Sequence, residues 1–172
     1  ITSFLLFNLV IMKGILLGIT HIALFLLFYL LDLLPESRFF LAGGHIIVFL
    51  MITIGVAKNY FKDEYSSFLK AFTHFIVYLS ISSVVSIGFD YTFNNYIDTG
   101  YKYILAEQRV EQINNRRERK GVGAYETLDS EKIEKKASLE AYGQNLLTSS
   151  ILNLVVAFAI TGVGLLYRKA NE

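Results

Sequence analysis

Long runs of apolar residues alternate with short polar stretches along most of the chain. A helix needs about 20 apolar residues to cross about 30 Å of hydrocarbon. The runs at 14–34, 39–57, 66–89 and 146–167 meet this length. A lipid-exposed loop would leave its backbone groups unpaired in hydrocarbon, so four separate helices are the simplest arrangement. The pattern predicts an all-α fold, an integral membrane four-helix bundle that forms a single membrane domain over residues 1–172.

The hydrophilic segment between the third and fourth predicted spans, residues 95–144, keeps helical periodicity. One apolar stripe recurs there at three- and four-residue spacing: Tyr103, Ala106, Val110 and Ile113. Gly121 and Gly123 interrupt it, and Asp129 or Ser130 can cap a second helix. We therefore predict that this polar hairpin consists of two helical arms rather than a disordered tail.

Charge is concentrated in the polar hairpin and supports the assignment of the spans. Residues 98–140 contain nine of the 15 acidic and nine of the 16 Lys and Arg residues, so the rest of the chain is nearly uncharged. Near the other span ends, basic residues gather on the side of the two termini: Lys13, Lys58, Lys62, Lys70, Arg168 and Lys169. The opposite short loop carries only Arg38. The positive-inside rule then predicts cytoplasmic termini and a periplasmic or extracellular polar hairpin.

Residues 1–11 are apolar and precede Met12. The basic region and small-residue cleavage site of a signal peptide are not visible there. These residues either lengthen the first helix, lie in the membrane interface, or derive from sequence upstream of a natural start at Met12. The sequence leaves these alternatives open.

Several short motifs resemble the domain-of-unknown-function 4199 family of small bacterial inner-membrane proteins. They are the run from Gly14 to Gly18, the stretches Ser66-Ser67-Phe68 and Lys70-Ala71-Phe72, and Phe93-Asn94-Asn95-Tyr96-Ile97-Asp98 followed by Tyr101. The resemblance covers roughly residues 12–170. It implies a four-helix protein of the bacterial inner membrane with a start near Met12, and in such a membrane the charge distribution places the polar hairpin in the periplasm. It implies no catalytic residues, because the family has no established activity.

Three histidines, His21, His45 and His74, fall inside predicted spans, where ionisable residues are costly and often functional. His21 and His74 lie at similar predicted depth and are the only candidate cofactor ligands, for a metal, a haem or a proton relay. We favour the alternative that each neutral imidazole bonds to a neighbouring helix, because the pair lacks the further ligands of a typical site. No cofactor and no metal centre are therefore predicted.

Small residues mark the expected contacts between helices. Gly14 and Gly18 form a GxxxG step, which lets two helix backbones approach closely. The last span carries one stripe at four-residue intervals: Ser149, Asn153, Ala157 and Thr161. Packing inside the bundle is the favoured interpretation of both features, and an interface with a partner chain is the alternative.

The remaining charged groups have simple interpretations. Four carboxylates are predicted to lie near the extracytoplasmic surface of the membrane that the chain crosses: Asp32, Glu36, Asp90 and Asp98. We interpret them as solvated loop and helix-end charges. The basic run 116–120 is interpreted as a solvated helix end, with contact to a partner or an anionic polymer as the alternative. A net charge of +1 gives no reason to expect nucleic-acid binding.

These features favour a non-enzymatic function, since no phosphate loop, nucleophile elbow or zinc-binding helix motif is present. The leading hypothesis is an accessory or scaffold subunit that contacts lipid and other membrane-protein subunits. One alternative is a small oligomeric transporter or channel. The other is a membrane enzyme or cofactor carrier that uses His21 and His74.

Overall fold

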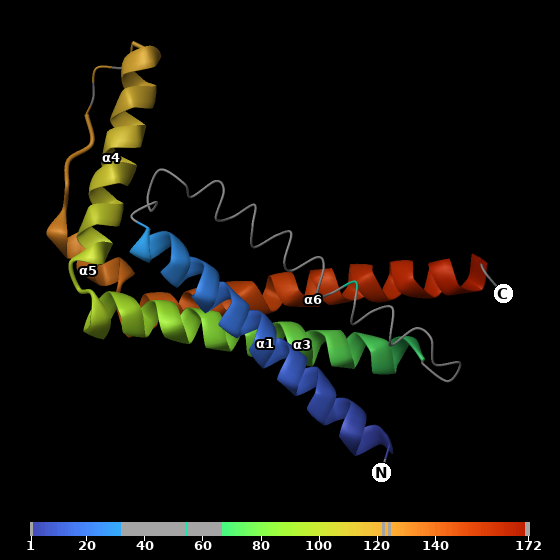
Figure 1. Cartoon of the computed structure of the whole chain (residues 1–172). Coiled ribbons are helices and arrows are strands. Elements are labelled where there is room, and N and C mark those ends of the chain that lie inside the picture. Colours follow the sequence, from blue (N-terminus) through green and yellow to red (C-terminus); the bar gives the residue numbers. More distant parts are fainter. Residues whose placement is uncertain (1, 32–53, 55–66, 122, 124, 171–172) are drawn as a thin grey trace. The chain divides into compact units, whose positions relative to one another are not determined.

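The computed structural model describes residues 2–31, 54, 67–121, 123 and 125–170 (Figure 1). Every regular element among these residues is helical, so the described chain is all-α. In order, the elements are α1 (Thr2–Leu30), α3 (Phe68–Thr92), the π-helix η1 (Phe93–Ile97), α4 (Tyr101–Arg119), α5 (Ser130–Lys136) and α6 (Leu139–Ala170). The predicted second span, 39–57, lies outside the described residues except for Ile54.

Three segments of the described chain are long and apolar enough to cross a membrane, and they indicate a multi-pass membrane protein in contact with lipid. These segments are Val10–Leu30, Phe68–Ile97 and Leu139–Leu166. They correspond to the first, third and fourth predicted spans. The last one begins before the predicted residue 146, because α6 continues without a break from its polar first turns into the apolar run.

The chain divides into two compact units. The first, which we call the membrane unit, comprises Ile1–Ser86 and Leu146–Glu172, and the second comprises Ile87–Asn145. The second unit contains η1, α4 and α5, and it coincides closely with the predicted polar hairpin.

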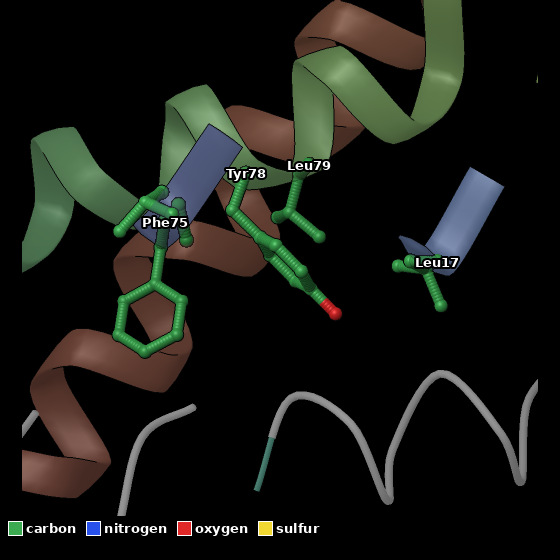
Figure 2. Packing of buried hydrophobic residues seen from close by; sticks show 6 residues of the cluster. Leu17, Phe75, Tyr78 and Leu79 are labelled. Atoms are coloured by element: carbon green, nitrogen blue, oxygen red, sulfur yellow. The ribbon is translucent and has the colours of Figure 1, made fainter. Parts of the chain in front are cut away.

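The core of the membrane unit lies where α1, α3 and α6 meet. Phe75, Tyr78 and Leu79 of α3 are buried there, together with Leu17 of α1 and Ala157 of α6 (Figure 2). Much of the remaining surface of α6 is exposed and apolar, as expected of a helix that meets lipid hydrocarbon. Its exposed side chains include Leu147, Ile151, Leu154 and Val155.

Contacts inside the membrane unit fix the relative directions of the three helices. Gly14 of α1 lies against Tyr78 and Ile81 of α3, and Gly18 lies against Ser82 and Val85. A later residue of α1 thus contacts later residues of α3, so the two helices run in the same direction. The contacts of α6 have the opposite order: Phe158 meets Phe68 with ring centroids 5.6 Å apart, and Asn153 meets Ser83. Helix α6 is therefore antiparallel to α3 (Figure 1).

Candidate functional site

The GxxxG step of α1 forms a very close helix contact in the membrane unit. A Cβ atom placed on Gly14 would lie 2.7 Å from the Tyr78 carbonyl oxygen, and one on Gly18 would lie 2.6 Å from the Val85 Cβ. Real Cβ atoms do not tolerate such distances, so only glycine permits this approach of α1 to α3. Both glycines therefore serve packing within the chain.

The small-residue stripe of α6 also faces into the membrane unit. Ala157 and Thr161 are fully buried, and Ser149 is half-buried. The Asn153 side-chain amide donates a hydrogen bond to the Ser83 hydroxyl over 3.0 Å. Thr161 Oγ has no hydrogen-bond partner among the described residues. The stripe thus provides one polar pair and two buried small side chains on the inner face of α6.

Loss of the Asn153–Ser83 hydrogen bond is expected to cost little stability. Such bonds between membrane helices contribute about 0.6 kcal/mol on average and at most about 1.7 kcal/mol. We expect Asn153→Ala and Ser83→Ala each to lower the thermal unfolding midpoint in detergent by a few degrees at most. The unfolding midpoint of the double variant should fall no further than that of the less stable single variant, since both changes remove the same hydrogen bond. Additive losses would show that the two side chains act independently.

The π-helix η1 is the centre of a polar network in the second unit. Asn95 Nδ2 donates to the carbonyl oxygen of Ala137 over 3.0 Å, at the point where α5 ends. Asn94 Nδ2 donates to the Tyr142 hydroxyl of α6 over 3.1 Å. Two adjacent asparagines therefore tie η1, which directly follows α3, to the break between α5 and α6 and to the first turn of α6. A π-helix directs adjacent side chains differently from an α-helix, and such segments are frequent at functional sites.

The start of α4 is fixed by residues next to η1. Asp98 Oδ1 accepts hydrogen bonds from the backbone N–H groups of Gly100 and Tyr101, each over 3.1 Å. The buried rings of Phe93 and Tyr101 pack edge to face with centroids 5.6 Å apart. Asp98, interpreted from the sequence as a solvated helix-end charge, therefore also binds the backbone N–H groups of Gly100, the N-cap residue of α4, and of Tyr101, its first residue.

A carboxylate joins the two arms of the polar hairpin. Glu134 of α5 accepts from Lys102 Nζ over 2.8 Å and from the Tyr103 hydroxyl, both on α4. The hydrogen bond from Lys102, and after it that from Tyr103, lowers the pKa of Glu134. The same bond to Glu134 raises the pKa of Tyr103. The carboxylate form of Glu134 is therefore the form that holds α5 on α4.

The Glu134 contact should weaken in acid. Because folding lowers the pKa of this carboxyl, its contribution to stability is complete above the unfolded value of about 4.3 and is lost as the pH falls through the lower folded value. We expect amide hydrogen exchange in α5, corrected for its intrinsic pH dependence, to accelerate as the pH drops below about 4. Glu134→Gln should show the faster exchange already at neutral pH and little further pH dependence. If amide hydrogen exchange in α5 were the same in Glu134→Gln as in the parent protein at neutral pH, Glu134 would not have this role.

Residues 125–129, which we call the strap, run alongside α4 without helical structure (Figure 1). The side-chain amide of Asn114 bonds twice to the backbone of Glu126, accepting from its N–H over 2.8 Å and donating to its carbonyl oxygen over 3.0 Å. Arg117 lies 3.8 Å from the Glu126 carboxylate. The other basic side chains of the run 116–120, Arg116, Arg119 and Lys120, are exposed.

Comparison with known proteins identifies a family. The family described as Protein of unknown function (DUF4199) matches the chain over residues 13–162. The chain belongs to the DUF4199 family. No curated protein and no solved structure matches the chain.

The DUF4199 match covers most of each apolar segment and the whole of the second unit. The network residues of η1 and the polar hairpin, including Asp98, Asn114 and Glu134, all lie within it. The first 11 residues lie outside the match, although α1 begins at Thr2 and Val10 is buried in the core. In this structure, residues 2–11 therefore lengthen the first helix, which is one of the three alternatives that the sequence leaves open.

The other predicted site residues of this DUF4199 protein are spread over the two units. His21 of α1 and His74 of α3 are both half-buried in the membrane unit. No group of three or more His, Asp or Glu residues suited to a metal ion occurs within the described part of the chain. Asp90 lies in the second unit, and His45, Asp32 and Glu36 lie outside the described residues.

The polar network of this DUF4199 protein was not predicted from the sequence. Asn94 and Asn95 stand out there only as part of a family motif, and Asn114 and Glu134 do not stand out at all. Their partners lie between 12 and 48 positions away in the chain. One sequence feature could have indicated the network: two adjacent asparagines, Asn94 and Asn95, follow an apolar run. A helix end does not need two amide side chains, so the pair indicates hydrogen bonds to other segments.

Proposed function

We propose that this DUF4199 protein is a non-enzymatic accessory or scaffold subunit of a bacterial inner-membrane complex, with its polar hairpin as the docking element. The observation that carries the proposal is the way the polar hairpin is built. It is held by Asn94, Asn95, Asn114 and Glu134 in one defined arrangement rather than left as a linker. Long polar segments between spans are uncommon without a role.

The helix directions support four spans. Helices α1 and α3 run parallel, so the chain must cross the membrane an odd number of times between them. The apolar run 39–57 is long enough for one such crossing. With α6 antiparallel to α3, four crossings place both termini on one side and the polar hairpin on the other. The Lys and Arg distribution then favours cytoplasmic termini and a periplasmic polar hairpin.

The use of the small residues also supports docking through the polar hairpin. Gly14, Gly18, Asn153 and Ala157, the candidates for an intramembrane partner interface, all make contacts within the chain. The exposed side of α6 instead presents large apolar side chains, as hydrocarbon requires. The second unit is the part of the described chain that offers a fixed polar surface.

Of the two alternative functions, only the transporter has a supporting observation. A small oligomeric transporter is supported by the buried Thr161 hydroxyl, which has no partner among the described residues and lies on the stripe that contains Asn153. A cofactor carrier or enzyme that uses His21 and His74 together gains no such support. The contacts of Gly14 with Tyr78 and of Gly18 with Val85 place the two histidines about three helical turns apart along the parallel helices α1 and α3.

Purification of the native complex in a mild detergent separates these functions. Native mass spectrometry should show this chain in a stoichiometric complex with a different membrane protein, and the absorbance spectrum should show no haem. A symmetric homo-oligomer that conducts ions after reconstitution would support the transporter instead. A bound haem or metal would support the cofactor carrier, and either result would overturn the scaffold proposal.

A further inference from the structure

The strap offers one free edge of extended backbone. In an extended chain, the N–H and C=O of one residue point to the same side, and those of the next residue point to the opposite side. Asn114 binds both groups of Glu126, which shows that the chain is extended there and that this edge is occupied. Among the described residues, neither Tyr125 nor Thr127 makes a backbone hydrogen bond. Their groups lie on the edge away from Asn114.

Basic side chains line α4 on the side of the free edge. With 3.6 residues per turn, Arg109, Arg116 and Lys120 fall on one flank of α4, and Asn114 falls on the other side of Arg117. All three basic residues are exposed. The acidic residues of α4 lie on the flank of Asn114: Glu107, Glu111 and Glu118. The free edge of the strap therefore borders a positive surface.

Two large apolar side chains of the strap are also exposed. Tyr125 is 66% exposed and Leu128 is 46% exposed, although each belongs to a segment fixed on α4. Strand addition uses such features together: backbone hydrogen bonds supply affinity, and neighbouring side chains supply selectivity. A positive border selects an acidic partner through charge complementarity.

We propose that the free edge of the strap binds an extended, acidic segment of a partner protein by strand addition. The backbone of Tyr125 and Thr127 pairs with the added strand, and the Tyr125 ring contacts the apolar side chains on the same face of that strand. Arg109, Arg116 and Lys120 attract its carboxylates. This site rests on the proposed function, for which it supplies the place and chemistry of docking.

A designed peptide tests the site without knowledge of the native partner. The probe is a fluorescein-labelled peptide of roughly ten alternating valine and aspartate residues, long enough to cover the strap. Binding to the full chain in nanodiscs of uncharged lipid is measured by fluorescence anisotropy. The peptide should bind, whereas its counterpart with lysine in place of aspartate should not. No binding, or equal binding of both peptides, would overturn the proposal.

Backbone methylation separates strand addition from simple charge attraction. Two further probes carry N-methyl groups on alternate backbone nitrogens, one set on each edge of the peptide. One of the two should bind like the parent and the other should fail, because only one edge of an added strand pairs with the strap. If both methylated peptides bind like the parent, the interaction is electrostatic and the proposal is wrong.

Matched variants locate the binding surface on α4. Combined Arg116→Gln and Lys120→Gln changes should weaken binding of the valine–aspartate peptide about tenfold, a difference of about 1.4 kcal/mol. Combined Arg119→Gln and Lys136→Gln changes also remove two positive charges, but at positions away from the strap, and should leave peptide binding unchanged. Equal weakening by both pairs would show a response to net charge and would contradict the site.

This experiment can fail independently of the proposed function. If replacement of the polar hairpin abolishes a native complex but the peptide does not bind, the strap is not the docking edge and the scaffold proposal stands. If the peptide binds but the native complex survives the replacement, the site is real and the scaffold proposal is wrong.

Discussion

Replacing residues 108–132 by a short Gly/Ser linker is expected to abolish the native complex while leaving the protein in the membrane. The replacement removes most of α4, the strap and the first turn of α5. It keeps Lys102, Tyr103 and Glu134, which join the bases of the two arms. Membrane insertion should persist, because the apolar helices supply their own hydrophobic driving force.

Co-purification in mild detergent measures this effect, and membrane fractionation verifies insertion. The Asn153→Ala variant is a suitable control, because it removes one hydrogen bond inside the membrane unit and leaves the polar hairpin intact. That control should retain the partner in full. A shortened chain that still recovers every partner of the full-length chain would exclude the polar hairpin as the docking element.

Gly14→Val is expected to cause the largest loss of stability among single substitutions in the membrane unit. Its Cβ would lie 2.7 Å from a backbone oxygen of α3, so no side-chain rotation relieves the clash and the helices must separate. Overpacking of this kind costs about 1–3 kcal/mol. The thermal unfolding midpoint in detergent should fall by roughly 5–10 °C, and Gly18→Val should behave similarly.

Two other glycines serve as matched controls for this prediction. Among the described residues, nothing lies within 4 Å of the position that a Cβ would occupy on Gly88 of α3 or on Gly162 of α6, so Gly88→Ala and Gly162→Ala meet no described neighbour. Alanine also favours helix over glycine by roughly 0.5–1 kcal/mol. These variants should be as stable as the parent or slightly more stable. Equal destabilisation at all four positions would refute the close contact of α1 with α3.

The sequence predicted the helical elements because their signals are local. The apolar runs of α1, α3 and α6 follow from hydropathy alone, and Asp129 caps α5 as predicted, accepting from the Lys132 N–H over 3.2 Å. Gly121 interrupts the helical arm with a positive φ of 66°, the conformation that glycine adopts most readily. Each of these features depends on residues close together in the chain.

Features that depend on distant partners could not be predicted. Ile133, Ala137 and Ala141 recur every four residues, a spacing typical of one continuous helix, but the helix is interrupted between α5 and α6. Ser138 Oγ accepts from the Ala141 N–H to start the new helix, and Asn95 binds the Ala137 carbonyl at the break. Likewise, GxxxG predicted a close contact for α1 but could not show that α3 is its partner.

Four spans require that the polar hairpin and the C-terminus lie on opposite sides of the membrane, and cysteine labelling tests this directly. The chain has no native cysteine, so single cysteines can be introduced by Ser130→Cys and Asn171→Cys. Both should react with a membrane-impermeant maleimide in permeabilised cells. In spheroplasts with an intact inner membrane, only the Ser130→Cys protein should react. Labelling of both proteins in intact spheroplasts, or of Asn171→Cys alone, would contradict the proposed topology.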